Sequence, residues 1–166
     1  MTDQFLKLKE SLTGAWEGEG FAQYPTISNT KYTEKLAFTP DEFKDAIHFQ
    51  QKTLYKNDTE NNGQTVFWDT GFILLKEDKI LLVSSQVGGR QETYELIRNE
   101  VNRFIFESIH IENDGKQTIR SQRIFTINES ALNYELNMAS RGLDFQNHLS
   151  ATLKRLGSPI SSPAPA

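Results

Sequence analysis

The chain has 166 residues, and its 18 lysines and arginines against 22 aspartates and glutamates give a net charge of −4. It contains no cysteine, which excludes disulfides, Cys-ligated zinc, iron–sulfur clusters and cysteine nucleophiles. A mildly acidic chain without a long apolar stretch matches neither nucleic acid nor a membrane as a partner. We expect one folded domain over residues 1–156, located in the cytoplasm.

The N-terminal segment predicts a short helix, because Phe5, Leu8 and Leu12 recur at i, i+3 and i+7 and Gly14 ends the pattern. After Gly14 the period changes to two, and turn residues such as those at 113–115 separate the runs. A last run at 149–156 suits either a strand or a helical turn. The other predicted strands lie near residues 15–23, 31–39, 46–56, 65–75, 79–86, 91–98, 102–111, 117–127 and 131–139.

Many short strands joined by turns predict an all-β antiparallel fold, either a barrel or a sandwich. The inward parity of one strand mixes Phe49 and Tyr55 with Gln51 and Thr53. A sandwich core tolerates few unpaired polar groups, whereas a barrel with a cavity can place them against ligand or water. We therefore predict a closed barrel, followed by a disordered tail over the proline-rich residues 157–166.

The first predicted strand carries an unusual motif. Gly14, Trp16, Gly18 and Gly20 share one parity, which removes side chains from one face of the strand. Such a face permits the close approach of another backbone or of a flat ligand. A Gly-x-Trp pair is also typical of lipocalin-like barrels, in which the Trp plugs one end, and that interpretation remains open.

The longer pattern is more specific. The motif at residues 14–20 is followed by Tyr24-Pro25-Thr26-Ile27, and together they resemble the nitrobindin family of haem-binding β-barrels. The resemblance covers residues 12 to 156 and implies a ten-stranded antiparallel, calycin-like barrel, similar to fatty-acid-binding proteins, that holds one haem b. Further blocks in the family's order lie at residues 32–38, 49–53, 69–72, 86–92, and 138–139 followed by 148–155.

The resemblance also implies roles for individual residues. In the family, the His of the His-Leu signature is the axial iron ligand, and that position is His148. Thr26 is the implied hydrogen-bond donor near the haem. Lys116 matches a family lysine that pairs with a haem propionate, although a solvated charge beside a turn explains Lys116 equally well. The parity of His48 predicts a solvent-facing side chain, and His110 is expected at a rim, which leaves His148 as the candidate ligand.

One departure from the family is Phe67, which stands where some members carry a distal histidine. A phenylalanine side chain donates no hydrogen bond and no proton. We therefore expect an apolar, crowded distal wall that excludes water, disfavours a sixth protein ligand and narrows the access of haem.

The resemblance implies nitrogen-oxide chemistry, in which ferric haem converts peroxynitrite to nitrate and ferrous haem binds nitric oxide, with His148 holding the iron. The expected activity is therefore that of a peroxynitrite isomerase, and haem, peroxynitrite and nitric oxide are the expected small-molecule partners. A homodimer is left open.

The alternative is a carrier of a fatty acid or another apolar ligand without haem. Arg120 or Arg123, together with Tyr134, would hold the carboxylate, and their opposite parity lets at most one of the two arginines point inward. Asp69 and Glu95 could serve acid–base chemistry, but the sequence shows no pairing between them, and a solvated face is expected for both.

Overall fold

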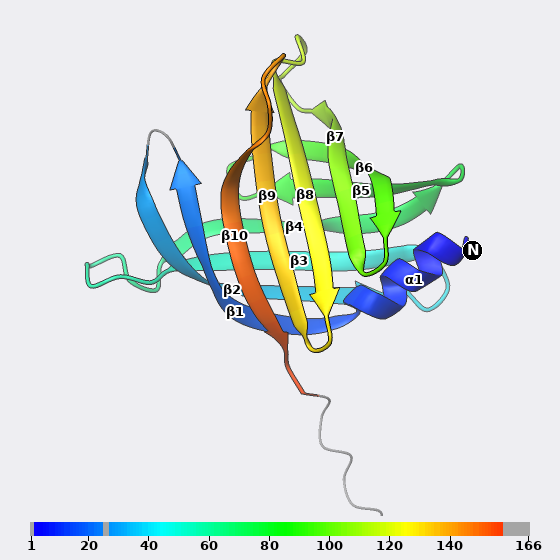
Figure 1. Ribbon diagram of the computed structural model, residues 1–166, viewed down its shortest axis with the longest axis horizontal. Coiled ribbons are helices and arrows are strands. Elements are labelled where there is room, and N and C mark those ends of the chain that lie inside the picture. The colour runs from blue at the N-terminus through cyan, green and yellow to red at the C-terminus, as the bar shows by residue number, and fades with distance from the viewer. Residues whose placement is uncertain (1, 25–26, 158–166) are drawn as a thin grey trace, which may run out of the picture.

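The computed structural model describes residues 2–24 and 27–157. Within these residues one helix precedes ten antiparallel strands, which close into a barrel because β1 pairs with both β2 and β10 (Figure 1). This confirms the predicted fold class, and the last run of the sequence is a strand. The elements are α1 (Asp3–Leu12), β1 (Gly14–Tyr24), β2 (Ile27–Pro40), β3 (Ala46–Tyr55), β4 (Thr65–Lys76), β5 (Lys79–Gln86), β6 (Gln91–Glu100), β7 (Arg103–Ile111), β8 (Ile119–Asn128), β9 (Ala131–Ser140) and β10 (Gln146–Arg155).

The N-terminal helix forms where the apolar spacing predicts it. Its buried residues are Phe5, Leu8 and Leu12. The hydroxyl of Thr2 caps the helix by accepting a hydrogen bond from the amide of Phe5 at 3.3 Å. The helix ends at Leu12 and is capped by Thr13. Gly14 follows, and its φ of 131° suits a residue without a side chain.

Helix α1 lies at one end of the barrel and is joined to it by Trp16. The indole nitrogen of Trp16 donates to the carbonyl of Leu12 at 2.9 Å, and its ring is 1 % exposed. The guanidinium of Arg155 lies 4.2 Å from the Trp16 ring centroid and donates to the carbonyl of Ser11 at 3.1 Å. Trp16 therefore plugs one end of the barrel, as in the lipocalin-like interpretation of the motif.

The glycines of the first strand make room for other parts of the barrel. A Cβ atom at Gly18 would lie 2.0 Å from the carbonyl oxygen of Thr152 on β10. At Gly20 it would lie 2.3 Å from the ring of Tyr32. The side-chain-free face thus allows the close approach of a neighbouring backbone and of an aromatic ring inside the barrel.

Two sequence predictions fall on parts of the chain that the structure does not describe. Thr26 is one of these residues, and nearly all of the predicted tail, residues 158–166, is the other. The domain boundary at residue 156 stays a prediction. Within the described ranges, no helix is both long and apolar enough to cross a membrane.

Candidate functional site

A cavity of about 280 Å³ lies toward the end of the barrel that α1 does not occupy. Strand β1 shows the arrangement, because Trp16 near its start packs against α1 whereas Ala22 near its end lines the cavity. One part of the wall is apolar, and the other part carries charged groups. The apolar part comprises Ala22, Val66, Phe67, Leu136, Met138 and Leu149.

His148 reaches the cavity through a β-bulge in β10. Asn147 pairs with Asn137 and Leu149 with Leu136, so His148 is an extra residue in the ladder. In a regular strand His148 would point away from the barrel, because its neighbour Leu149 points inward. The bulge turns both side chains toward the cavity, and His148 is only 8 % exposed.

A second bulge shapes the wall on β4. Thr53 of β3 pairs with Phe67 and Leu54 pairs with Thr65, which leaves Val66 as the extra residue. Val66 and Phe67 consequently both line the cavity. Three strands, β1 to β3, separate β4 from β10 in one direction and five, β5 to β9, in the other. Phe67 and His148 therefore line one cavity from roughly opposite walls.

The environment of His148 favours a neutral side chain. Burial lowers the pKa of the imidazole below its ordinary value. A neutral imidazole is the form that binds a metal ion. The apolar walls and the inward-turned histidine thus form a site that can hold a flat apolar ligand with a metal centre.

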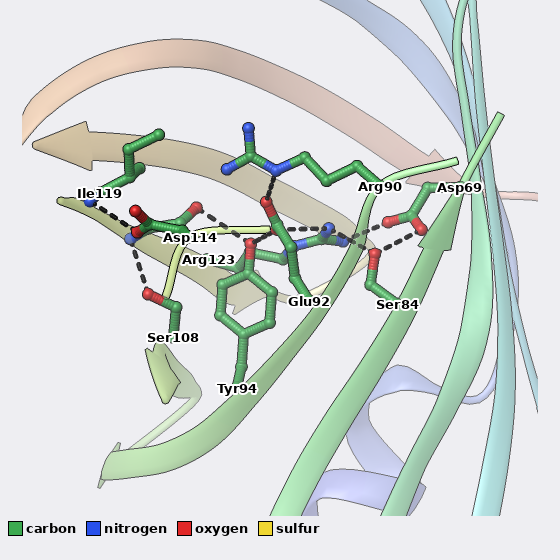
Figure 2. Close-up of polar contacts among 10 residues, drawn as sticks. Asp69, Ser84, Arg90, Glu92, Tyr94, Ser108, Asp114, Ile119 and Arg123 are labelled. Carbon is green, nitrogen blue, oxygen red and sulfur yellow. Dashed lines mark hydrogen bonds and ion pairs between the residues drawn. The ribbon is translucent and has the colours of Figure 1, made fainter. Parts of the chain in front are cut away.

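The charged part of the wall is organised around Arg123 of β8, whose side chain is 2 % exposed (Figure 2). Its guanidinium donates to the carboxylate of Asp69 at 2.5 Å and to the hydroxyl of Ser84 at 3.1 Å. Ser84 in turn donates to Asp69 at 2.7 Å. The expectation of a solvated Asp69 is wrong, because Arg123 compensates its charge inside the barrel. Glu95 is partly exposed and pairs with Lys79 at 3.3 Å.

Glu92 links this cluster to a second arginine. One of its oxygens lies 3.8 Å from Arg123, and the other lies 2.5 Å from Nε of Arg90. The hydroxyl of Tyr94 donates to Glu92 and also lies 3.0 Å from the hydroxyl of Ser121 (Figure 2). Arg90 and Glu92 were not predicted as site residues from the sequence. Their only signal was their place in the block at residues 86–92.

Arg120 and Arg123 lie on opposite faces of β8, as their parity predicts. Arg120 faces outward, where it donates to the carbonyl of Leu143 at 2.8 Å and pairs with Glu107 at 3.6 Å. Arg123 alone of the two lines the cavity, and Asp69 and Glu92 already neutralise it.

The remaining predicted residues that the structure describes lie outside the cavity wall. Lys116 is exposed in the turn between β7 and β8 and is not a lining residue. His48 lies on the outer face of β3, 2.9 Å from the hydroxyl of Thr70. His110 is exposed and lies 3.5 Å from Glu112. The structure thus brings together His148 and Phe67, and it places Lys116 apart from them.

Comparison with known proteins identifies the family of this barrel. A family model described as "THAP4-like, heme-binding beta-barrel domain" matches residues 6–155. The chain belongs to this family. The matched range spans nearly the whole barrel and includes the bulges at His148 and Val66.

Relatives within this family carry an enzymatic name. The protein named peroxynitrite isomerase 2 of Mycobacterium ulcerans (strain Agy99) is 29% identical over 150 residues, which cover 87% of this chain and 90% of the relative. The protein named peroxynitrite isomerase of Nocardia farcinica (strain IFM 10152) is 28% identical over 150 residues, with coverages of 87% and 86%. The crystal structure of Rv2717c from M. tuberculosis superposes with a TM-score of 0.72 at 23% identity, covering 95% of this chain and 99% of that chain, and shows the same fold.

Proposed function

We propose that this protein binds haem b in the cavity through His148, converts peroxynitrite to nitrate and binds nitric oxide. The observation that carries the proposal is the bulge that turns His148 into an apolar cavity. When bound, haem supplies an iron centre that coordinates nitrogen oxides. The relatives' names provide the reaction, and it is proposed for this chain on that basis.

The residues present fit a haem. Leu136, Met138 and Leu149 line the cavity beside His148 and provide apolar contacts for a macrocycle. The lowered pKa of His148 keeps the imidazole neutral and able to ligate iron. The volume of about 280 Å³ lies just below the ~300–1,000 Å³ typical of ligand sites. Bulky side chains such as Phe67 account for the limited room.

Phe67 and Val66 exclude water from the wall that faces His148, because neither side chain can hold it by hydrogen bonds. Thr26 and Lys116 remain proposed contacts of the haem, the first near the macrocycle and the second with a propionate.

The fatty-acid carrier receives less support from the charges. A carrier needs a cation that is available to the carboxylate of its ligand. Arg123 is buried between Asp69 and Glu92, and Tyr134 is buried as well. A ligand carboxylate would have to displace one of these acidic groups from Arg123, at the cost of leaving a buried charge unpaired.

The test is a titration of the purified protein with ferric haem, followed by the Soret absorption band. Wild-type protein and His110→Ala, which alters an exposed histidine, should give the same shifted Soret band. His148→Ala should lose this spectrum and bind ferric haem roughly tenfold or more weakly, because the ligand of the iron is gone. Metal-free protoporphyrin, which has no iron to ligate, should bind all three proteins with similar affinity.

The absence of a Soret shift in wild-type protein, or an unchanged spectrum in His148→Ala, would overturn the proposed ligation. The isomerase activity is measured separately. Stopped-flow decay of peroxynitrite should be faster with the haem-loaded wild-type protein than with the same concentration of apoprotein, and equal rates would reject the enzymatic part of the proposal.

A further inference from the structure

Arg90 is a half-buried cation at the charged part of the cavity wall, and the protein does not use all of its hydrogen-bond donors. Its Nε makes the ion pair with Glu92 described above. Its Nη2 is shielded from solvent and has no hydrogen-bond partner within residues 2–24 and 27–157. In Figure 2 the two terminal nitrogens point away from Glu92. A shielded guanidinium N–H without an acceptor is costly, and an anion in the cavity would satisfy it.

The backbone around Arg90 is held firmly in the turn between β5 and β6. The amide of Gln86 donates to the carbonyl of Arg90 at 2.9 Å. The amide of Val87 donates to the carbonyl of Trp68, the residue that follows Phe67, at 2.9 Å. Arg90 therefore extends from a fixed turn that is joined to the Phe67 wall, which itself offers no side-chain hydrogen-bond donor.

The charged side chains around Arg90 carry no excess negative charge that would repel an anion in the cavity. Arg90 and Arg123 balance the carboxylates of Asp69 and Glu92, so the cluster has no net charge. Glu34, in the barrel interior, also interacts with the charge of Arg123, but burial raises the pKa of Glu34 to about 7, so it is largely uncharged below neutral pH.

Two other charged groups lie near Arg90. Neither Asp114 nor Arg123 satisfies the unused donor of Arg90 or offers an accessible cation in its place. Asp114 lies within the field of Arg90, but its carboxylate already accepts hydrogen bonds from Thr118 and Ile119. Arg123 is enclosed by its own acidic partners. Both arginines that line the cavity have a shielded N–H without a hydrogen-bond partner among the described residues, Nη2 of Arg90 and Nε of Arg123. The side chain of Arg90 is 34 % exposed and that of Arg123 only 2 %, so Arg90 is the one that a ligand in the cavity can reach.

We infer that Arg90 is the anion-binding residue of this cavity and takes the oxygen atoms of an oxyanion, either a small monoanion or a carboxylate of a larger ligand. The planar guanidinium matches two oxygens of such a group. For a small anion at a haem, the inference rests on the proposed function. The cavity and its cation exist without haem, so the inference can also be tested on the apoprotein.

The apoprotein test compares two naphthalene probes of similar shape and different charge. 1-Anilinonaphthalene-8-sulfonate carries an oxyanion, whereas N-phenyl-1-naphthylamine is neutral. The substitution Arg90→Gln removes the charge but keeps a hydrogen-bond donor for Glu92, which guards against misfolding. Arg90→Gln should lower the affinity for the sulfonate probe by about tenfold and leave the affinity for the neutral probe unchanged. Arg90→Lys should recover part of the affinity.

The matched control is Arg98→Gln, because Arg98 lies on β6, the strand that follows the turn of Arg90, but is exposed and pairs with Glu100. It should change the affinity for neither probe. Equal sulfonate affinities in wild-type protein and Arg90→Gln, or a parallel loss of both probes, would overturn the inference, since the second result would reflect shape rather than charge.

Two further measurements distinguish whether the oxyanion is a carboxylate of a larger ligand or a small monoanion. If a ligand carboxylate binds Arg90, Arg90→Gln lowers the affinity for ferric haem by about tenfold. The affinity for the dimethyl ester of haem is then unchanged. If a small monoanion binds Arg90, the affinity for haem is unchanged, and the Kd of nitrite, read from the Soret band, rises by about tenfold. Either result supports the inference, and the absence of both in a haem-loaded protein rejects it. A protein that binds no haem rejects the proposed function, while the naphthalene probes still decide the role of Arg90.

Discussion

The interior of the barrel holds ionisable side chains, and Glu34 is the most unusual of them. It is 1 % exposed and accepts a hydrogen bond from Gln51. Its second carboxylate oxygen has no hydrogen-bond partner in the part of the chain that the structure describes. Burial raises the pKa of Glu34 from 4.5 to about 7, although the Gln51 hydrogen bond and the charge of Arg123 both lower it. The carboxyl therefore keeps its proton in conditions where an exposed glutamate would lose it.

This pKa predicts a pH-dependent stability. The stabilisation from protonated Glu34 is fully present below pH 4.5 and is lost as the pH rises through 7, because the folded state then still binds a proton that the unfolded chain has released. The shift corresponds to about 3 kcal/mol. Glu34→Gln should remove this loss, so wild-type protein should lose about 3 kcal/mol more unfolding free energy than the variant between about pH 4 and pH 8.

Urea unfolding at several pH values measures the difference between the two proteins. Glu10→Gln, at an exposed position of α1, serves as the control and should follow the wild-type curve. Parallel curves for wild-type protein and Glu34→Gln would show that Glu34 does not hold its proton.

The strands owe the shape of the cavity to local irregularities. Both bulges, one at His148 and one at Val66, place adjacent residues on the same side of a strand. A regular strand cannot do so, because its side chains alternate between two faces. These two bulges lie where the ligand is proposed to bind, whereas the pairing of β1 with β10 is regular from Trp16 to Ala22. The register also shifts away from the cavity wall, between Leu96 and Arg98 of β6.

The close approach of β1 and β10 predicts a specific cost for one methyl group. In Gly18→Ala the new Cβ would lie 2.0 Å from the carbonyl oxygen of Thr152, a backbone atom that cannot move away without shifting the strand. We expect a loss of ~1–3 kcal/mol in unfolding free energy, measured by urea denaturation. Gly115→Ala is the matched control, because a Cβ there meets no atom within 4 Å. Similar losses in both variants would contradict the packing role of Gly18.

The packed helix and the cavity lie toward opposite ends of the barrel. Helix α1, Trp16 and Arg155 occupy one end. The cavity with His148 and Arg90 lies toward the other. Aromatic side chains fill the interior, with the ring of Phe125 5.7 Å from Phe38, 6.0 Å from Phe106 and 5.3 Å from Tyr134 between centroids. Such packing gives the cavity a rigid support.

This arrangement predicts that the helix affects stability and not binding. Leu8 lies on the buried face of α1 and is fully buried. Leu8→Ala should reduce the unfolding free energy by ~2–5 kcal/mol. The affinity for N-phenyl-1-naphthylamine, measured where the variant is still folded, should stay at the wild-type value. Leu6→Ala, on the exposed side of the same helix, should change neither quantity. Weaker probe binding by folded Leu8→Ala would show that the two ends are coupled.

Local patterns were enough to predict the helix and the first nine strands, whereas the last run suited either a strand or a helical turn. The spacing of Phe5, Leu8 and Leu12 and the alternation that follows Gly14 yield the helix and the strands, because both periodicities act between near neighbours in the chain. The ordered motifs also led to the right family and to His148 and Phe67, which the structure places in one cavity.

Other features of the site could be established only from the tertiary structure of the closed barrel. Parity alone would turn His148 away from the cavity, and its inward direction depends on the register of β10 against β9. Asp69 looks like a surface residue until Arg123, 54 positions later, pairs with it inside the barrel. Arg90 has its donor beside the cavity only because its turn is hydrogen-bonded to β4. Periodicity describes each strand by itself, whereas the direction of a bulged side chain and the partner of a buried charge are set by strands far away in the chain.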